Sequence, residues 1–303
     1  MSDPGADQPG AADQPAPLSP LPREEYVEQR HLFRTMGEQI RENVPAQDML
    51  AGIREEVLAT TKLPMAIDFM LAELRHLGTF STAMQRLGHY FTPFQCYVTA
   101  EAEDDRRRFD MRIALEILAR EAEYRAQGIS RQGLFLYQLE ALSRNRLGYD
   151  RGLEAIAGDP SYDQAWREWI LTVRRQIGLV ETADLIYVRS EYYRERAAAL
   201  SLGEESPAEP EVAVLFGRRE GRIAWANRRK DPLYLFAALH RQLGYPEVPR
   251  PRAEDPEERL LPVLARRIEL LESRLKLVED EQRGGFDLTK FYQKPPEPPA
   301  ERG

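Results

Sequence analysis

Apolar residues recur at helical spacing along most of this chain, and the apolar runs end repeatedly at a glycine. A glycine after the last helical turn adopts the left-handed conformation without steric cost, so it marks a helix end. These glycines are Gly78, Gly88, Gly128, Gly148, Gly178 and Gly244. Helix starts are marked by a capping side chain before a proline at Thr92-Pro93, Asp159-Pro160, Asp231-Pro232 and Asp255-Pro256. The pattern predicts a mainly α protein.

The predicted helices follow from these signals and from the apolar stripes between them. They span 22–43, 46–60, 64–77, 80–88, 93–126, 131–147, 149–157, 161–177, 182–200, 232–243 and 256–283. The 93–126 helix carries two neighbouring stripes, one through Leu115 and Leu118 and one through Ile113 and Ile117. Because two adjacent stripes need a wide apolar contact, we expect this helix to lie centrally.

The stretch EVAVLFGRREGRIAWAN, at 211–227, departs from the helical pattern. Its large apolar residues alternate on both sides of a glycine-containing turn, Val214 and Phe216 before it and Ile223 and Trp225 after it. Alternation of period two predicts a β-hairpin inserted between the last helices of the domain. A lone hairpin is marginally stable in water, so we expect its large side chains to pack on the helices.

Basic residues gather on and just after this predicted hairpin, in a chain whose net charge is −8. They are Arg218, Arg219, Arg222, Arg228, Arg229 and Lys230. At a turn they could hold the phosphates of an anionic partner without recognising a nucleotide sequence. Alternatively they keep the chain soluble and pair with acids of the preceding loop, which are Glu204, Glu205, Glu209 and Glu211. Stacking on single-stranded nucleic acid needs exposed aromatic rings, and Phe216 and Trp225 are expected in the core, so nucleic acid is disfavoured as a partner.

A coiled-coil-like helix is predicted at 253–283, after a proline-rich stretch that we expect to act as a stiff linker. Its apolar seam alternates steps of three and four residues, as in a short coiled coil. The seam runs through Leu261, Leu264, Ile268, Leu271, Leu275 and Val278. A further apolar row, which includes Leu270, exceeds what a two-stranded coiled coil needs. Self-association and packing on the protein's own body are therefore both open.

The two ends of the chain contain too few apolar residues to bury a core. We expect disordered tails at 1–21 and 284–303, on either side of a helical domain at 22–252 and the coiled-coil-like helix. The second tail nevertheless carries an apolar cluster formed by Phe286, Leu288, Phe291 and Tyr292. Such a cluster either docks on the protein's own body or binds a partner.

The common catalytic motifs are absent from the sequence, including the nucleophile elbow, the phosphate-binding loop and the paired metal-binding histidines or cysteines. One pattern of metal-ligating residues occurs twice: Glu28 with His31 and Glu73 with His76 are both E-x-x-H pairs. Two such pairs on helices, with two further glutamates, build the di-iron site of some helical bundles. Chance spacing in a glutamate-rich chain is the alternative, and we expect no cofactor.

The single cysteine, Cys96, cannot form an intramolecular disulfide and is expected to be a small buried apolar residue. The N-terminus lacks the features of a signal peptide, and no apolar run approaches the roughly 18 residues of a membrane span. These features predict a cytoplasmic protein without a membrane segment. The acidic balance also argues against general affinity for nucleic acid.

The sequence best fits a non-enzymatic helical interaction or scaffold protein that holds a protein partner, or a second copy of itself, through its C-terminal helix. One alternative is a weak anion or nucleic-acid binder that uses the basic residues of 217–230. Another is a di-iron carboxylate oxidase that uses the two E-x-x-H pairs.

Overall fold

The computed structural model of the protein describes residues 19–104, 106, 109–200 and 213–250. Within these ranges the chain forms thirteen helices and no strand, so the predicted mainly α class is confirmed. By its contacts the chain divides into two units, Met1–Arg250 and Pro251–Gly303, and every described helix belongs to the first. The predicted coiled-coil-like helix and the predicted C-terminal tail lie outside the described residues.

The helices are α1 (Arg23–Arg41), α2 (Ala46–Glu56), α3 (Leu63–Leu77), α4 (Phe80–Arg86), α5 (Pro93–Glu103), α6 (Met111–Ala126), α7 (Arg131–Arg144), α8 (Tyr149–Ala157), α9 (Gln164–Gln176), α10 (Thr182–Val188), α11 (Glu191–Leu200), α12 (Arg218–Ala226) and α13 (Pro232–Leu243).

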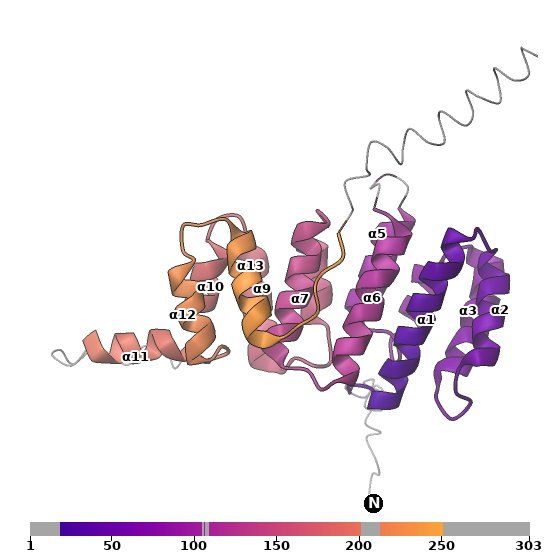
Figure 1. Ribbon diagram of the computed structural model, residues 1–303, viewed down its shortest axis with the longest axis horizontal. Coiled ribbons are helices and arrows are strands. Elements are labelled where there is room, and N and C mark those ends of the chain that lie inside the picture. The colour runs from indigo at the N-terminus through magenta and orange to yellow at the C-terminus, as the bar shows by residue number, and fades with distance from the viewer. Residues whose placement is uncertain (1–18, 105, 107–108, 201–212, 251–303) are drawn as a thin grey trace, which may run out of the picture. The chain divides into compact units, whose positions relative to one another are not determined.

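Contacts pass from helix to helix along two lines within this unit. One line runs through α2, α1, α6, α7, α13 and α12, which stand side by side in Figure 1. The other runs through α3, α4, α5, α8 and α9. The most extensive contact joins α1 to α6, while α11 makes its main contacts with α10 and α12 alone. In Figure 1, α11 points away from the other helices.

The predicted 93–126 helix is central, as its stripes indicated, but it is two helices. Leu115, Ile117 and Leu118 of α6 are buried in the core. The break follows from local capping. The Glu103 carboxylate accepts hydrogen bonds from the backbone of α4, at 2.5 Å from the Phe80 nitrogen, and the Asp110 carboxylate caps the start of α6. Glu103 and Asp110 therefore cap two different helices on either side of the break.

The predicted β-hairpin is wrong, because α12 occupies its turn and second half. Only the segment before Gly217 is extended, and there the backbone nitrogens of Leu215 and Phe216 donate to the Arg189 carbonyl, at 2.9 and 3.1 Å. That carbonyl lies between α10 and α11, which were predicted as one helix over 182–200. Phe216 is buried as expected.

Two small residues allow α12 to pack closely on the neighbouring helices. Gly221 and Ala224, three residues apart, form its buried side. A Cβ atom at Gly221 would lie 2.2 Å from the Ser190 Oγ atom, so the glycine permits a very close approach. The Arg, Glu and Ala residues of this stretch also favour a helix. Helical packing on the α10–α11 corner thus overrides a short alternating pattern.

The prediction of a stiff linker after α13 is wrong for residues 245–250, which pack on the helical body. The chain leaves α13 at Gly244, which has the left-handed conformation with φ 65°. Tyr245 and Val248 are then buried in the core rather than extended into solvent. We call residues 245–250 the anchor segment.

Candidate functional site

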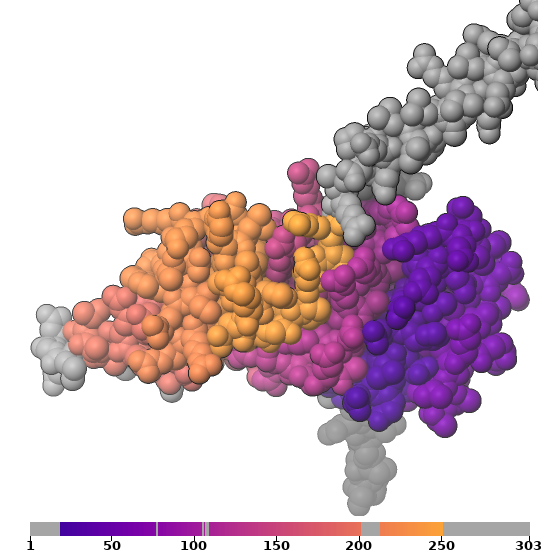
Figure 2. Space-filling view, in the orientation of Figure 1, coloured from indigo at the N-terminus to yellow at the C-terminus, as the bar shows by residue number. Residues whose placement is uncertain are grey.

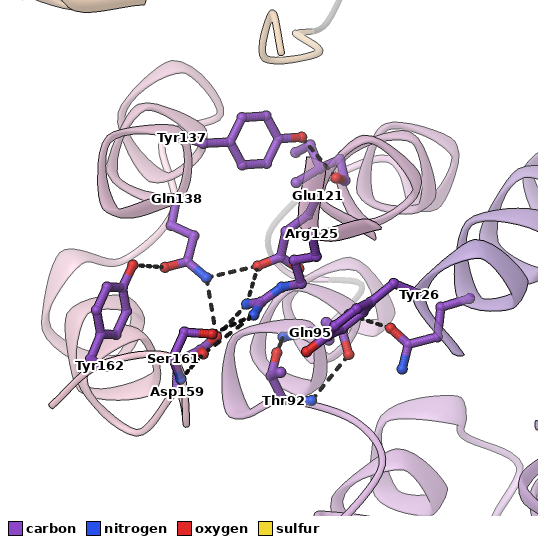
Figure 3. Close-up of polar contacts among 12 residues, drawn as sticks. Tyr26, Thr92, Gln95, Glu121, Arg125, Tyr137, Gln138, Asp159, Ser161 and Tyr162 are labelled. Carbon is purple, nitrogen blue, oxygen red and sulfur yellow. Dashed lines mark hydrogen bonds and ion pairs between the residues drawn. The ribbon is translucent and has the colours of Figure 1, made fainter. Parts of the chain in front are cut away.

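A cluster of charged and polar side chains lies buried between α6, α7 and the connection from α8 to α9 (Figure 3). It comprises Glu121, Arg125, Gln138, Asp159 and Tyr162, and we call it the Arg125 cluster. The Tyr162 hydroxyl donates to Gln138 Oε1 at 2.9 Å. The charged side chains are at most 1% exposed. A buried charge is costly unless it is paired, so the contacts of each group matter here.

Arg125 is held by both carboxylates of the cluster. Its Nη2 atom donates to Glu121 Oε1 at 2.9 Å and also to Asp159 Oδ2. Its Nη1 atom donates to the Ser161 hydroxyl at 3.0 Å. Gln138 donates to the same Glu121 oxygen at 2.7 Å. The network therefore joins two helices and a loop through one guanidinium group.

The cluster contains two carboxylates and one guanidinium, and this excess of carboxylates affects the pKa values of both residue types. Burial raises the pKa of the Glu121 carboxyl, and Arg125 only partly offsets that effect. Burial acts to lower the pKa of Arg125, but the two carboxylates outweigh it and raise that pKa well above its ordinary value. Glu121 Oε2 and Arg125 Nε have no hydrogen-bond partner among the described residues.

The cluster is a structural lock rather than a reaction centre. Its charged side chains are sealed from solvent, so a substrate has no access to them. Both carboxylates already contact the Arg125 guanidinium within the protein. What the arrangement does is fix the relative positions of α6, α7 and the α8–α9 loop.

A cavity of about 380 Å³ opens beside α4, α5 and α8. Its lining consists of Gln85, Gly88, Phe91, Pro93, Cys96, Tyr97, Ala100, Glu101 and Arg151. Burial raises the pKa of the Cys96 thiol to about 12. The thiol therefore stays protonated and is a poor nucleophile, in line with the apolar role expected for it. No histidine lines the cavity.

The six predicted anion-binding residues lie on α12 and on the turn after it. Two of them are paired: Arg218 with Glu195, at 3.0 Å, and Arg228 with Asp184. The other four are exposed and have no carboxylate partner in the described ranges. These are Arg219, Arg222, Arg229 and Lys230. The acids that were expected to pair with them lie within 201–212, outside the described residues.

Trp225 lies among these cations, so its predicted place in the core is wrong. The side chain is 36% exposed. The guanidinium carbons of Arg196 and Arg228 each lie 4.3 Å from its ring centroid, and the Tyr187 ring packs at 4.7 Å. Together with Arg219, Arg222, Arg229 and Lys230, Trp225 forms a surface that we call the α12 face. In Figure 2 no other helix covers α12 and α13, shown in orange, on the side turned to the viewer.

Three of the four E-x-x-H residues already have other contacts. Glu28 accepts a hydrogen bond from the Leu58 nitrogen at 3.0 Å, and His31 lies 3.1 Å from a carboxylate oxygen of Glu56. Glu73 pairs with an arginine of α4 at 2.7 Å, and His76 is exposed at the end of α3. Among the described residues, no three His, Cys, Asp or Glu side chains gather as a metal site would require. The geometry gives the di-iron hypothesis no support.

The predicted partner-binding residues lie outside the described residues, so their roles stay predictions. They are Leu264, Ile268, Leu271, Leu275, Val278, Phe286, Leu288, Phe291 and Tyr292.

Sequence reasoning missed the Arg125 cluster, although one signal was present. Glu121 and Arg125 are four residues apart and flank Ala122, which continues the apolar stripe of α6 through Leu118. Charged residues beside a core stripe have to find buried partners. The sequence does not identify Asp159 as that partner.

None of the described helices is long and apolar enough to cross a membrane. Comparison with known proteins found no matching family model, no matching curated protein and no matching solved structure. The functional inference therefore rests on this chain's own residues.

Proposed function

We propose that this protein is a non-catalytic interaction or scaffold protein that presents its C-terminal segment, residues 251–303, to a protein partner or to a second copy of itself. The observation that supports this most directly is the anchoring of residues 245–250. The chain is tied to the helical body immediately before the segment that carries the predicted coiled-coil seam.

Three hydrogen bonds hold the anchor segment to α6 and to α7 and its C-cap. The Tyr245 hydroxyl donates to Glu140 Oε2 at 2.7 Å. Arg120 donates to the Glu247 carbonyl at 2.6 Å, and the Asn145 side chain donates to the Pro249 carbonyl at 3.0 Å. These bonds fix the chain directly before residue 251, where the proposed binding segment begins.

The Arg125 cluster and Cys96 also support the proposal of a non-catalytic protein. The buried charged side chains of the Arg125 cluster are paired with one another, and the Cys96 thiol stays protonated. The polar groups of the Arg125 cluster are thus already used in holding the fold together.

The test places serine at three seam positions of the full-length chain, Leu264, Leu271 and Leu275. Removing apolar side chains from a coiled-coil seam should abolish self-association or partner capture through it. Light scattering reports self-association, and a quantified pull-down with immobilised protein reports a partner.

A matched control places serine at Arg266, Arg274 and Lys276 of the same segment, which leaves the seam intact. The control should behave like the wild-type chain. A wild-type chain that is monomeric and retains no partner through this segment would exclude the proposed function. So would a seam variant that keeps the same assemblies.

A further inference from the structure

The cations of the α12 face are carried by backbone that is held to neighbouring helices. Arg222 lies three residues before Trp225 on α12, and Arg229 lies in the turn that follows the end of the helix. Gly221, four residues before Trp225, seats the helix closely on the α10–α11 corner. The turn after α12 is fixed too, because the Arg229 nitrogen donates to Glu181 Oε2 at 2.7 Å.

Trp225 determines which anion this face can take. Two guanidinium groups already lie over its indole ring, each 4.3 Å from the centroid. Cation–π contact holds Arg196 and Arg228 at the surface and occupies the ring that a nucleotide base would need for stacking. The face offers charge without a free stacking platform.

Apolar side chains continue the face onto the start of α13. Leu233 and Tyr234, three and four residues after Lys230, are 44% and 66% exposed. α13 packs against α12, so these apolar groups border the cations. A ligand that spans both regions needs negative charges next to an apolar side chain.

We propose that the α12 face binds an acidic segment of a protein partner, with carboxylates on Arg222, Arg229 and Lys230 and an apolar side chain against Leu233 and Tyr234. The net charge of −8 supports a short acidic segment over a nucleic acid. A long polyanion interacts with the charge of the whole molecule, whereas a short segment depends mainly on charges within about 10 Å of it. This surface is separate from the C-terminal segment and does not depend on the function proposed for it.

The test measures binding of a fluorescein-labelled peptide of about twelve residues, with glutamates around one phenylalanine, to the full-length chain by anisotropy. The variant Arg222→Glu/Arg229→Glu should bind about tenfold more weakly or worse, because two attractive contacts become repulsive. Affinity for the wild-type chain should fall between about 50 mM and about 200 mM salt.

The matched control is Arg41→Glu/Arg75→Glu, which reverses two exposed arginines on α1 and α3 and changes the net charge equally. It should bind the peptide like the wild-type chain, and circular dichroism should show that both variants are folded. Undetectable binding by the wild-type chain, an equal loss in the control, or tighter binding of an oligothymidine of similar length would overturn this assignment. Loss of the C-terminal seam should leave peptide binding unchanged.

Discussion

The Arg125 cluster and the α12 face use the same type of side chain in opposite environments. Arg125 is sealed in the protein between two carboxylates, whereas Arg222 and Arg229 are exposed without a carboxylate partner among the described residues. A buried guanidinium requires partners, because water cannot replace them. An exposed one is solvated and stays available. Where an arginine lies therefore decides whether it serves the fold or can serve a partner.

The largest effect should follow from Arg125→Met. The substitution leaves Glu121 and Asp159 buried without their cation, which should cost about 3–5 kcal/mol of unfolding free energy. Urea unfolding followed by circular dichroism measures the loss. A loss below about 1 kcal/mol would mean that the cluster relaxes or admits water. It would contradict the view that Arg125, unlike the arginines of the α12 face, serves the fold.

A smaller loss of unfolding free energy is expected for Gly221→Ala, which disturbs the close packing of α12 on the α10–α11 corner. The new Cβ atom would lie 2.2 Å from Ser190 Oγ and 2.9 Å from the Tyr192 Cβ atom. Overpacking of this kind costs about 1–3 kcal/mol and should displace α12. Urea unfolding gives the stability, and binding of the acidic peptide reports the geometry of the α12 face.

The control for that substitution is Gly52→Ala on α2, where a Cβ atom would meet nothing within 4 Å. Alanine is the better helix former by about 1 kcal/mol, so this variant should gain stability. Equal behaviour of the two glycine variants would show that α12 is not closely seated.

The pH dependence of stability should separate Glu121 from exposed acids. Its folded-state pKa is raised by burial above the ordinary value of 4.5, so its favourable contribution exists below the unfolded pKa. That contribution is lost as the pH rises through the folded pKa. The stability of the wild-type chain relative to Glu121→Gln should therefore fall as the pH rises above 4.5 and through the folded-state pKa.

Urea unfolding at a series of pH values measures this difference. Glu116→Gln, which removes an exposed carboxylate from the same helix, controls for the loss of one charge. A constant difference between the wild-type chain and Glu121→Gln would contradict the raised pKa.

The smallest stability effect is expected at the α12 face itself. Arg222→Ala and Arg229→Ala should each change the unfolding free energy by no more than about 0.5 kcal/mol, because exposed side chains without strong contacts contribute little. The same variants should weaken binding of the acidic peptide. A large stability loss without a change in binding would assign these arginines to the fold instead.

Helix caps could be predicted from the sequence where the capping side chain makes no tertiary ion pair. Thr92 forms a capping box with Gln95 at the start of α5, and Asp231 caps α13, both as expected. Asp159 was expected to start the next helix in the same way. Instead Asp159 binds Arg125, and Asp163 caps α9.

The remaining errors share a physical cause, which is that tertiary partners decide between local alternatives. The alternation from Val214 to Trp225 is too short to fix a strand, and the approach of Gly221 to Ser190 favours a helix. Trp225 is apolar enough for the core, yet arginines of two segments hold it at the surface. Of the candidate site, the sequence identified the cations but not the helix that carries them.

The anchor segment has a mechanical consequence. A partner that pulls on residues 251–303 does not peel α13 away first, because Glu247 and Pro249 are fastened to Arg120 and Asn145. The load passes directly to α6 and to the end of α7, and α6 also carries Arg125. Tension on the end of the chain should therefore act on the helices that the Arg125 cluster joins.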